Sequence, residues 1–96
     1  MTALEMARPD VLGHQLGHPL GHQLGHQLGL AVREAEILGL MATGLSNSGI
    51  ATRLSVSSKT IEHYVARIFV KLGISDSPDV NRRVQAVVRY LAASAA

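Results

Sequence analysis

The residues of this chain best suited to binding chemistry are basic, and they gather in one short stretch. Between Arg53 and Lys71 the only acidic residue is Glu62, and it is set against four basic ones: Arg53, Lys59, Arg67 and Lys71. A local excess of positive charge is the footprint expected of a surface that binds phosphate groups, although ordinary solvated surfaces often carry one too. This stretch is therefore the first candidate for a binding site.

Imidazole groups form a second candidate set, in a tetrapeptide repeat, Leu-Gly-His-Gln, that runs from Leu12 to Gln27. The repeat places a histidine at every fourth position: His14, His18, His22 and His26. In a helix this spacing would bring imidazoles together as metal ligands. The glycines and Pro19 oppose such a helix, at roughly 1 kcal/mol per Gly and about 3 kcal/mol for an interior Pro. We interpret residues 1–29 as a flexible low-complexity segment, with adventitious metal binding or partner docking as weaker alternatives.

Length and composition narrow the class of protein. The chain has 96 residues and no cysteine, which fits one small domain and excludes disulfides, thiolate metal sites and cysteine nucleophiles. It has neither an apolar run of membrane-spanning length nor a signal-peptide pattern, so we expect a cytoplasmic protein without a membrane partner. Residues 30–96 carry eight Lys or Arg against five acids, and we expect them to form the single functional domain.

Helical periodicity begins at Leu30 and predicts four helices and no strand, so the expected fold is all-α. The predicted helices cover residues 33–43, 47–54, 58–72 and 79–92. Their boundaries follow from serines that cap N-termini, glycines that end helices, and a Ser-Pro-Asp start signal for the last helix. These signals are Ser46 and Ser57, Gly44 and Gly73, and Ser77-Pro78-Asp79.

Each predicted helix carries an apolar stripe. The apolar positions are Ile37, Leu38, Leu40 and Met41 in the first helix; Ile50, Ala51 and Leu54 in the second; Ile61, Val65, Ile68, Phe69 and Leu72 in the third; and Val80, Val84, Val87, Val88 and Leu91 in the fourth.

The opposite side of the third helix faces outward and is largely polar. At 100° per residue it carries Lys59, His63, Ala66, Arg67 and Val70, with Glu62 at its shoulder. A short helix, a three-residue turn and a longer helix with such a face is the geometry in which a recognition helix enters the major groove of DNA. Two amphipathic helices and a turn could equally be half of a helical bundle.

A series of motifs runs through the same region: Leu30-Ala-Val-Arg33-Glu34-Ala-Glu36-Ile-Leu, Gly44-Leu-Ser46-Asn47, Ile50-Ala51, Leu54, Ser57, Thr60-Ile61, Val65, Ile68 and Lys71-Leu72-Gly73-Ile74. In this order they resemble the LuxR/FixJ-type helix-turn-helix effector domain, over about two-thirds of the chain. The tail from Ser77 to Leu91 resembles a version of this domain attached to response regulators. The resemblance implies a bacterial transcription regulator that binds double-stranded DNA in a sequence-specific way, with RNA polymerase as a candidate partner and no cofactor.

By this resemblance, particular side chains receive roles at the DNA. The positions that read base edges are Glu62, His63, Ala66 and Arg67, and those that contact phosphate or sugar are Ser46, Asn47, Lys59, Thr60, Tyr64 and Lys71. Arg67 can bond bidentately to a guanine, and Glu62 can accept a hydrogen bond from a cytosine amino group. For Glu62, His63 and Tyr64 an ordinary surface or packing role remains an alternative.

The resemblance also implies a homodimer formed by the helix at about 79–92. We expect Val84, Val88 and Leu91 at that interface, although some valines of this helix must pack on Ile37, Leu40 or Phe69 instead. Such a dimer would place two recognition helices roughly one DNA turn apart on an inverted-repeat site.

The sequence departs from the family pattern at two sites. Ala31 stands where the family usually has Thr, and Ser48-Gly49 where it has Lys-Glu, so each capping box lacks one partner at a cost of about 1 kcal/mol. Three other readings compete: a sigma-factor promoter-recognition domain, a protein-interaction module and a histidine-rich metal binder. An enzyme is not expected, because no catalytic arrangement sits where it could form a pocket.

Overall fold

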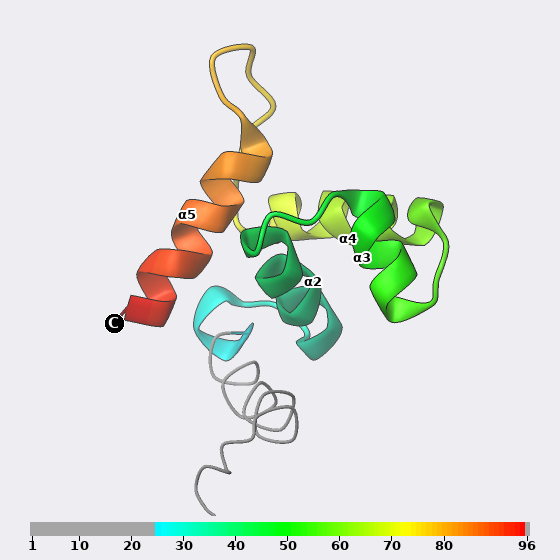
Figure 1. Ribbon diagram of the computed structural model, residues 1–96. Coiled ribbons are helices and arrows are strands. Elements are labelled where there is room, and N and C mark those ends of the chain that lie inside the picture. Colours follow the sequence, from blue (N-terminus) through cyan, green and yellow to red (C-terminus); the bar gives the residue numbers. More distant parts are fainter. Residues whose placement is uncertain (1–24, 96) are drawn as a thin grey trace, which may run out of the picture.

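The computed structural model describes residues 25–95 and consists of helices joined by short loops (Figure 1). The four helices are α2 (Val32–Ala42), α3 (Asn47–Leu54), α4 (Ser58–Lys71) and α5 (Arg82–Ala95), and residues 25–28 form a helical turn ahead of α2. No strand occurs within residues 25–95. The prediction of an all-α fold is confirmed, and the flexible segment predicted for residues 1–29 lies almost wholly outside the described residues.

The predicted boundary signals act as expected at the first three helices. The side chains of Ser46 and Ser57 accept hydrogen bonds from the backbone N–H groups of Gly49 and Thr60, at 3.1 and 3.0 Å, and so cap α3 and α4. Beyond α2 and α4, Gly44 (φ 99°) and Gly73 (φ 69°) adopt the left-handed conformation that ends a helix. The three ranges predicted from the sequence are therefore within two residues of the observed ones.

The start of α5 differs from the prediction. Ser77-Pro78-Asp79 forms a turn, in which Ser77 accepts hydrogen bonds from the backbone N–H groups of Asp79 and Val80, and the helix begins only at Arg82. Asn81 supplies the cap, because its side-chain oxygen accepts from the N–H of Val84 at 3.0 Å. The sequence contains two cap signals, Ser77 and Asn81, four residues apart. The sequence pattern alone favoured Ser77, which is not the cap.

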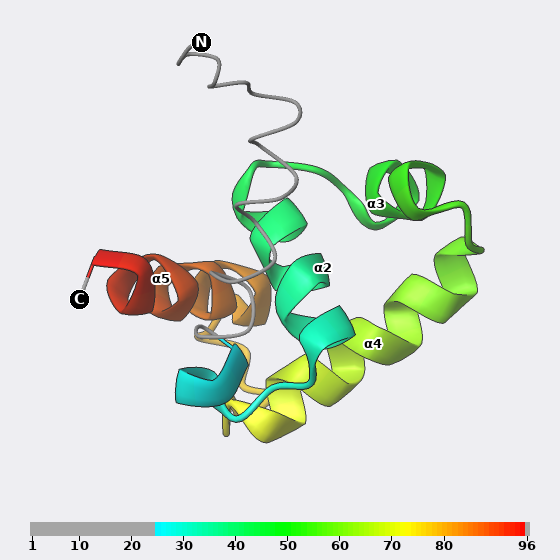
Figure 2. The same ribbon diagram turned by 90° about the horizontal axis from the view of Figure 1, so that it is seen from below.

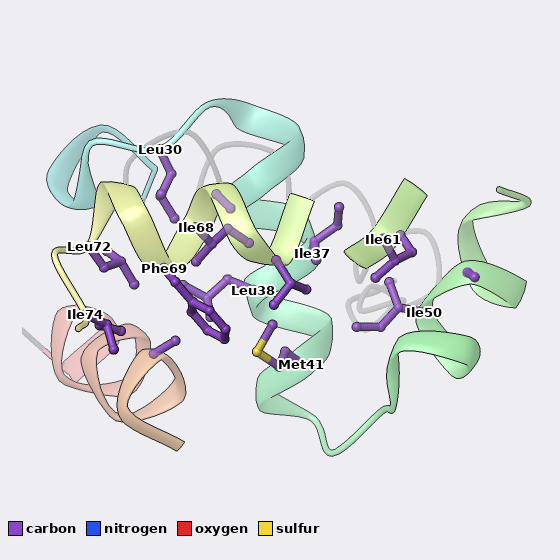
Figure 3. Close-up of a cluster of buried hydrophobic side chains, with 14 residues drawn as sticks. Leu30, Ile37, Leu38, Met41, Ile50, Ile61, Ile68, Phe69, Leu72 and Ile74 are labelled. Carbon is purple, nitrogen blue, oxygen red and sulfur yellow. The ribbon is translucent and has the colours of Figure 1, made fainter. Parts of the chain in front are cut away.

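The core is built around α2, which lies between α4 and α5 (Figure 2). The largest fully buried side chains are Ile37, Leu38, Ile50, Ile61 and Ile68, drawn from α2, α3 and α4. Figure 3 shows these side chains in one cluster with Phe69, Leu72 and Ile74. Burying each contributes about 1.5–3 kcal/mol, so this cluster fixes the positions of α3 and α4.

The apolar stripe predicted for the last helix is in fact divided between two faces. Ala86 is fully buried, and Val80, Val87 and Tyr90 pack against the core. In contrast, Val84, Val88 and Leu91 are each more than half exposed. This division agrees with the expectation that some valines of this helix pack on the core while Val84, Val88 and Leu91 remain available for another contact.

The N-terminus of α2 lacks one hydrogen bond that a single substitution should restore. Ala31 precedes the helix in an extended conformation, and its N–H donates to the Glu34 carboxylate at 2.8 Å, but its side chain has no oxygen to accept in return. We expect Ala31→Thr to stabilise the domain by about 1 kcal/mol, a rise in Tm of roughly 4–8 °C, because the hydroxyl would accept from the N–H of Glu34. Thermal unfolding measures this. Ala31→Val has the same shape without the hydroxyl, and an equal rise in both variants would contradict the capping explanation.

Candidate nucleic-acid interface

α3 and α4 are joined by the tight turn Ser55-Val56-Ser57, and they pack on each other and on α2. Ser55 has φ 59°, a left-handed conformation that is uncommon outside glycine, and the Val56 N–H donates to the carbonyl of Ala51 at 3.0 Å. This turn sets α4 across the end of α3, as Figure 2 shows. The three-residue turn predicted from the sequence is confirmed.

The outward face of α4 is exposed because the opposite side of the helix is buried against the core. Every residue predicted for the inward stripe, from Ile61 to Leu72, is buried. All members of the predicted outward face are exposed: Lys59, Glu62, His63, Ala66, Arg67 and Val70. The Arg67 guanidinium lies 5.7 Å from the centre of the half-buried Tyr64 ring, within cation–π range. The structure thus brings the four predicted base-reading residues onto one accessible face.

The residues predicted to contact phosphate have more varied surroundings. Lys59 is exposed near the start of α4, and the hydroxyl of Thr60 lies 2.9 Å from that of Ser57. Ser46 is exposed as the cap of α3. Asn47 and Lys71, in contrast, each bind a side chain that is distant in the sequence.

Lys71 pairs with an acid from α2. Its ammonium lies 2.8 Å from Glu34, whose side chain is only 3% exposed, whereas that of Lys71 is 40% exposed. Burial by itself raises the pKa of the Glu34 carboxyl. The hydrogen bonds from Lys71 and from the Ala31 N–H, together with the charges of Lys71 and Arg67, outweigh burial and hold that pKa below its ordinary value. Glu34 is therefore ionised at neutral pH, and Lys71 compensates its charge.

Asn47 is held by Arg83, a residue of α5 that the sequence analysis did not select. The Arg83 guanidinium donates to the side-chain oxygen of Asn47 at 2.8 Å and to the carbonyl of Leu45 at 2.7 Å. Burial lowers the pKa of Arg83, but a guanidinium remains charged at any physiological pH. Arg83 thus ties the start of α5 to the start of α3. The only signal in the sequence was an Arg-Arg pair at the start of the last helix.

Two further arginines of α5 hold it against α4, and sequence reasoning missed them as well. The Arg82 guanidinium stacks 4.8 Å from the centre of the Phe69 ring, and Arg89 donates to the carbonyl of Leu72 at the end of α4. All three arginines of α5 therefore bind within the domain, as Lys71 of α4 does. Net charge alone would have assigned them to a ligand.

The exposed side of α5 carries a row of apolar side chains, Val84, Val88 and Leu91, at the i, i+4, i+7 spacing of one helix face. A shallow depression beside it is lined by Val84, Gln85, Val88 and Arg89. These are the three residues predicted for a dimer interface. The structure leaves them uncovered in the single chain.

The histidine repeat contributes little to the described structure. His14, His18 and His22 lie outside the described residues, and His26 is exposed. Within residues 25–95 no group of three or more candidate ligands could hold a metal ion. None of the helices in that range is both long and apolar enough to cross a membrane.

A short helix, a tight turn and a longer helix with a buried back and an exposed polar face define a helix-turn-helix domain. The sequence profile of the family described as "Bacterial regulatory proteins, luxR family" matches residues 28–89. Because this match covers more than half of the chain, the protein belongs to the luxR family. This is a family of DNA-binding transcription regulators rather than a class of enzymes.

Among curated proteins, the chain is similar to the DNA-binding transcriptional activator DevR/DosR of Mycobacterium tuberculosis, with 42% identity over 59 residues. It is also similar to the oxygen regulatory protein NreC of Staphylococcus aureus, with 45% identity over 51 residues. These regions cover 62% and 53% of this chain, but the chain spans only 24% of either relative. No solved structure matched the chain.

Proposed function

We propose that residues 30–96 are the DNA-binding unit of a bacterial transcription regulator and that α4 enters the major groove of double-stranded DNA. The observation that carries this proposal is the exposed face of α4, where Glu62, His63, Ala66 and Arg67 lie together above a fully buried back. The DNA-binding activator named among its relatives supports the same role. Such a regulator would act in the bacterial cytoplasm, with RNA polymerase as a candidate partner at the promoter.

The chemistry of this face suits base edges. Arg67 presents a planar fork of donors that matches the O6 and N7 acceptors of guanine, and Glu62 can accept a hydrogen bond from the N4 amino group of cytosine. His63 can donate or accept, and Ala66 leaves room for a close approach of the helix to the bases. Glu62 would also repel phosphates, so its place on this face favours a base contact.

The phosphate contacts divide between two kinds of residue. Lys59, Ser46 and Thr60 are surface groups that can bond to phosphate directly. We retain Tyr64, Asn47 and Lys71 as contacts in the proposal, but their bonds within the domain give Asn47 and Lys71 a structural role too. Lys59 is therefore the better residue with which to measure a pure phosphate contact.

We further propose that two chains associate through Val84, Val88 and Leu91 of α5. More than half of each side chain is exposed in the single chain, and together they form a continuous apolar face. Burying such a face against a second copy removes it from water. The dimer would bind an inverted repeat whose half-sites lie about one helical turn apart.

Fluorescence anisotropy with random duplex DNA and with a site selected from an oligonucleotide pool, at two salt concentrations, tests the proposal. We expect Arg67→Ala to cost about 1–3 kcal/mol at one base pair and to relax the preference there. We expect Lys59→Ala to weaken binding to all sequences alike and to reduce the salt slope by about 1. If the wild-type protein binds no duplex at low salt, the proposed function is wrong, and protein partners become the better candidates for this face.

A further inference from the structure

Val70 has no evident structural role, although it is the most exposed of the large apolar side chains in the described residues. Its exposed fraction is 79%, whereas the apolar residues proposed for the dimer interface reach at most 57%. Valine is also a weaker helix former than Ala, Lys or Arg, so helix stability does not explain it either. A single apolar surface residue is ordinary in itself, and its position on α4 is what makes Val70 informative.

Val70 lies on the midline of the outward face, in the last turn of α4. At 100° per residue its direction is within roughly 20° of those of both Lys59 and His63. Ala66, one turn earlier, is also exposed, so the two form a short apolar strip along the middle of the face. Glu62 and Arg67 lie on its two sides. The outward face therefore ends in a short apolar strip, with hydrogen-bonding side chains on both sides of it and nearer the start of the helix.

The major groove offers one apolar group that matches this strip. The C5-methyl group of thymine projects into the groove, and apolar side chains recognise it by contact. Along the helix axis Val70 is about 4.5 Å beyond Arg67, a step comparable to the roughly 3.4 Å between neighbouring bases. A guanine read by Arg67 would therefore have a neighbouring base pair within reach of Val70.

We propose that Val70 is a further specificity-determining residue, which selects thymine at one position of each half-site through contact with its C5-methyl group. This inference rests on the proposed function. It adds a base preference that comes from an apolar contact, in addition to the contacts proposed for the polar residues of the same face.

The test removes the methyl group and the valine separately and then together. A site is selected with the wild-type protein, and each thymine is replaced in turn by deoxyuridine, which differs only by that methyl group. We expect one thymine per half-site at which the replacement weakens wild-type binding two- to five-fold. Val70→Ala should bind the thymine and deoxyuridine duplexes equally. Val32→Ala truncates an exposed valine outside α4 and should keep the wild-type sensitivity.

The outcomes separate this inference from the proposed function. If the wild-type protein binds its site but no thymine is sensitive, or if Val70→Ala keeps the full sensitivity, the role of Val70 is overturned while DNA binding stands. If the wild-type protein binds no duplex, the proposed function is wrong, and the role of Val70 is wrong with it. Circular dichroism should show Val70→Ala folded as the wild type is, because the side chain fills no space in the core.

Discussion

Val88→Glu should weaken binding to an operator with two half-sites by about 100-fold or more. The substitution should prevent dimerisation, so that each complex loses the linked second recognition helix. Val88 is 57% exposed in the single chain, so the change leaves no cavity in the fold, and glutamate is a good helix former. In a dimer, the charge would be buried in an apolar contact without a partner. Analytical ultracentrifugation of the protein, and anisotropy with duplexes of one and two half-sites, measure both effects.

The matched control is Val32→Glu, which introduces the same charge at a valine that is 52% exposed on α2. It should lower DNA affinity only slightly, through the added negative charge. Binding of Val88→Glu to a single half-site should also remain close to that of the control. If Val88→Glu sediments as the wild-type protein does and keeps its two-site affinity, α5 is not the dimer interface.

Lys71→Met should lower the free energy of unfolding at neutral pH by about 2 kcal/mol. The change leaves the buried carboxylate of Glu34 without its cation, and breaking a fully buried ion pair costs about 3–5 kcal/mol. The smaller figure allows for the 40% exposure of Lys71, since solvent weakens the pair. Denaturant unfolding measures the loss. Lys59→Met, an exposed lysine of the same helix, should change stability by about 0.5 kcal/mol or less.

The same variant should also change how stability depends on pH. In the wild-type protein the pKa of Glu34 is below its ordinary value of 4.5, so its contribution is fully present above pH 4.5 and is lost as pH falls through the lower, folded-state pKa. Without Lys71, burial should dominate and raise the pKa of Glu34. In acid, the folded state would then bind a proton at Glu34 more tightly than the unfolded state does. The difference between Lys71→Met and the wild type should therefore shrink as pH falls toward 4.

A double-mutant cycle with Glu34→Gln separates this explanation from a loss of packing. Once the buried charge is gone, Lys71→Met should cost clearly less than it does in the wild-type background. An equal cost in both backgrounds would show that the aliphatic part of Lys71, rather than its charge, stabilises the domain. In that case the ion pair has no measurable role.

Local signals were sufficient wherever a helix is defined by its own residues. The limits of α3 and α4 followed from a serine before each helix and, for α4, a glycine beyond it. The outward face of α4 followed from the period of its apolar residues, and the family motifs correctly indicated the luxR family. Capping and amphipathic periodicity act over a few residues, so they can be read without the fold.

The contacts between distant residues depended on the tertiary structure. Lys71 meets Glu34 and Arg83 meets Asn47 across separations of 37 and 36 residues, and no spacing rule relates such positions. The division of the α5 valines into a buried and an exposed group also depends on which side of that helix packs on α2. The sequence by itself determined the limits of α2, α3 and α4 to within two residues, the family and the outward face of α4. Only the tertiary structure decided which basic residues bind within the domain and which remain accessible, because partner choice depends on distances between elements rather than on patterns within them.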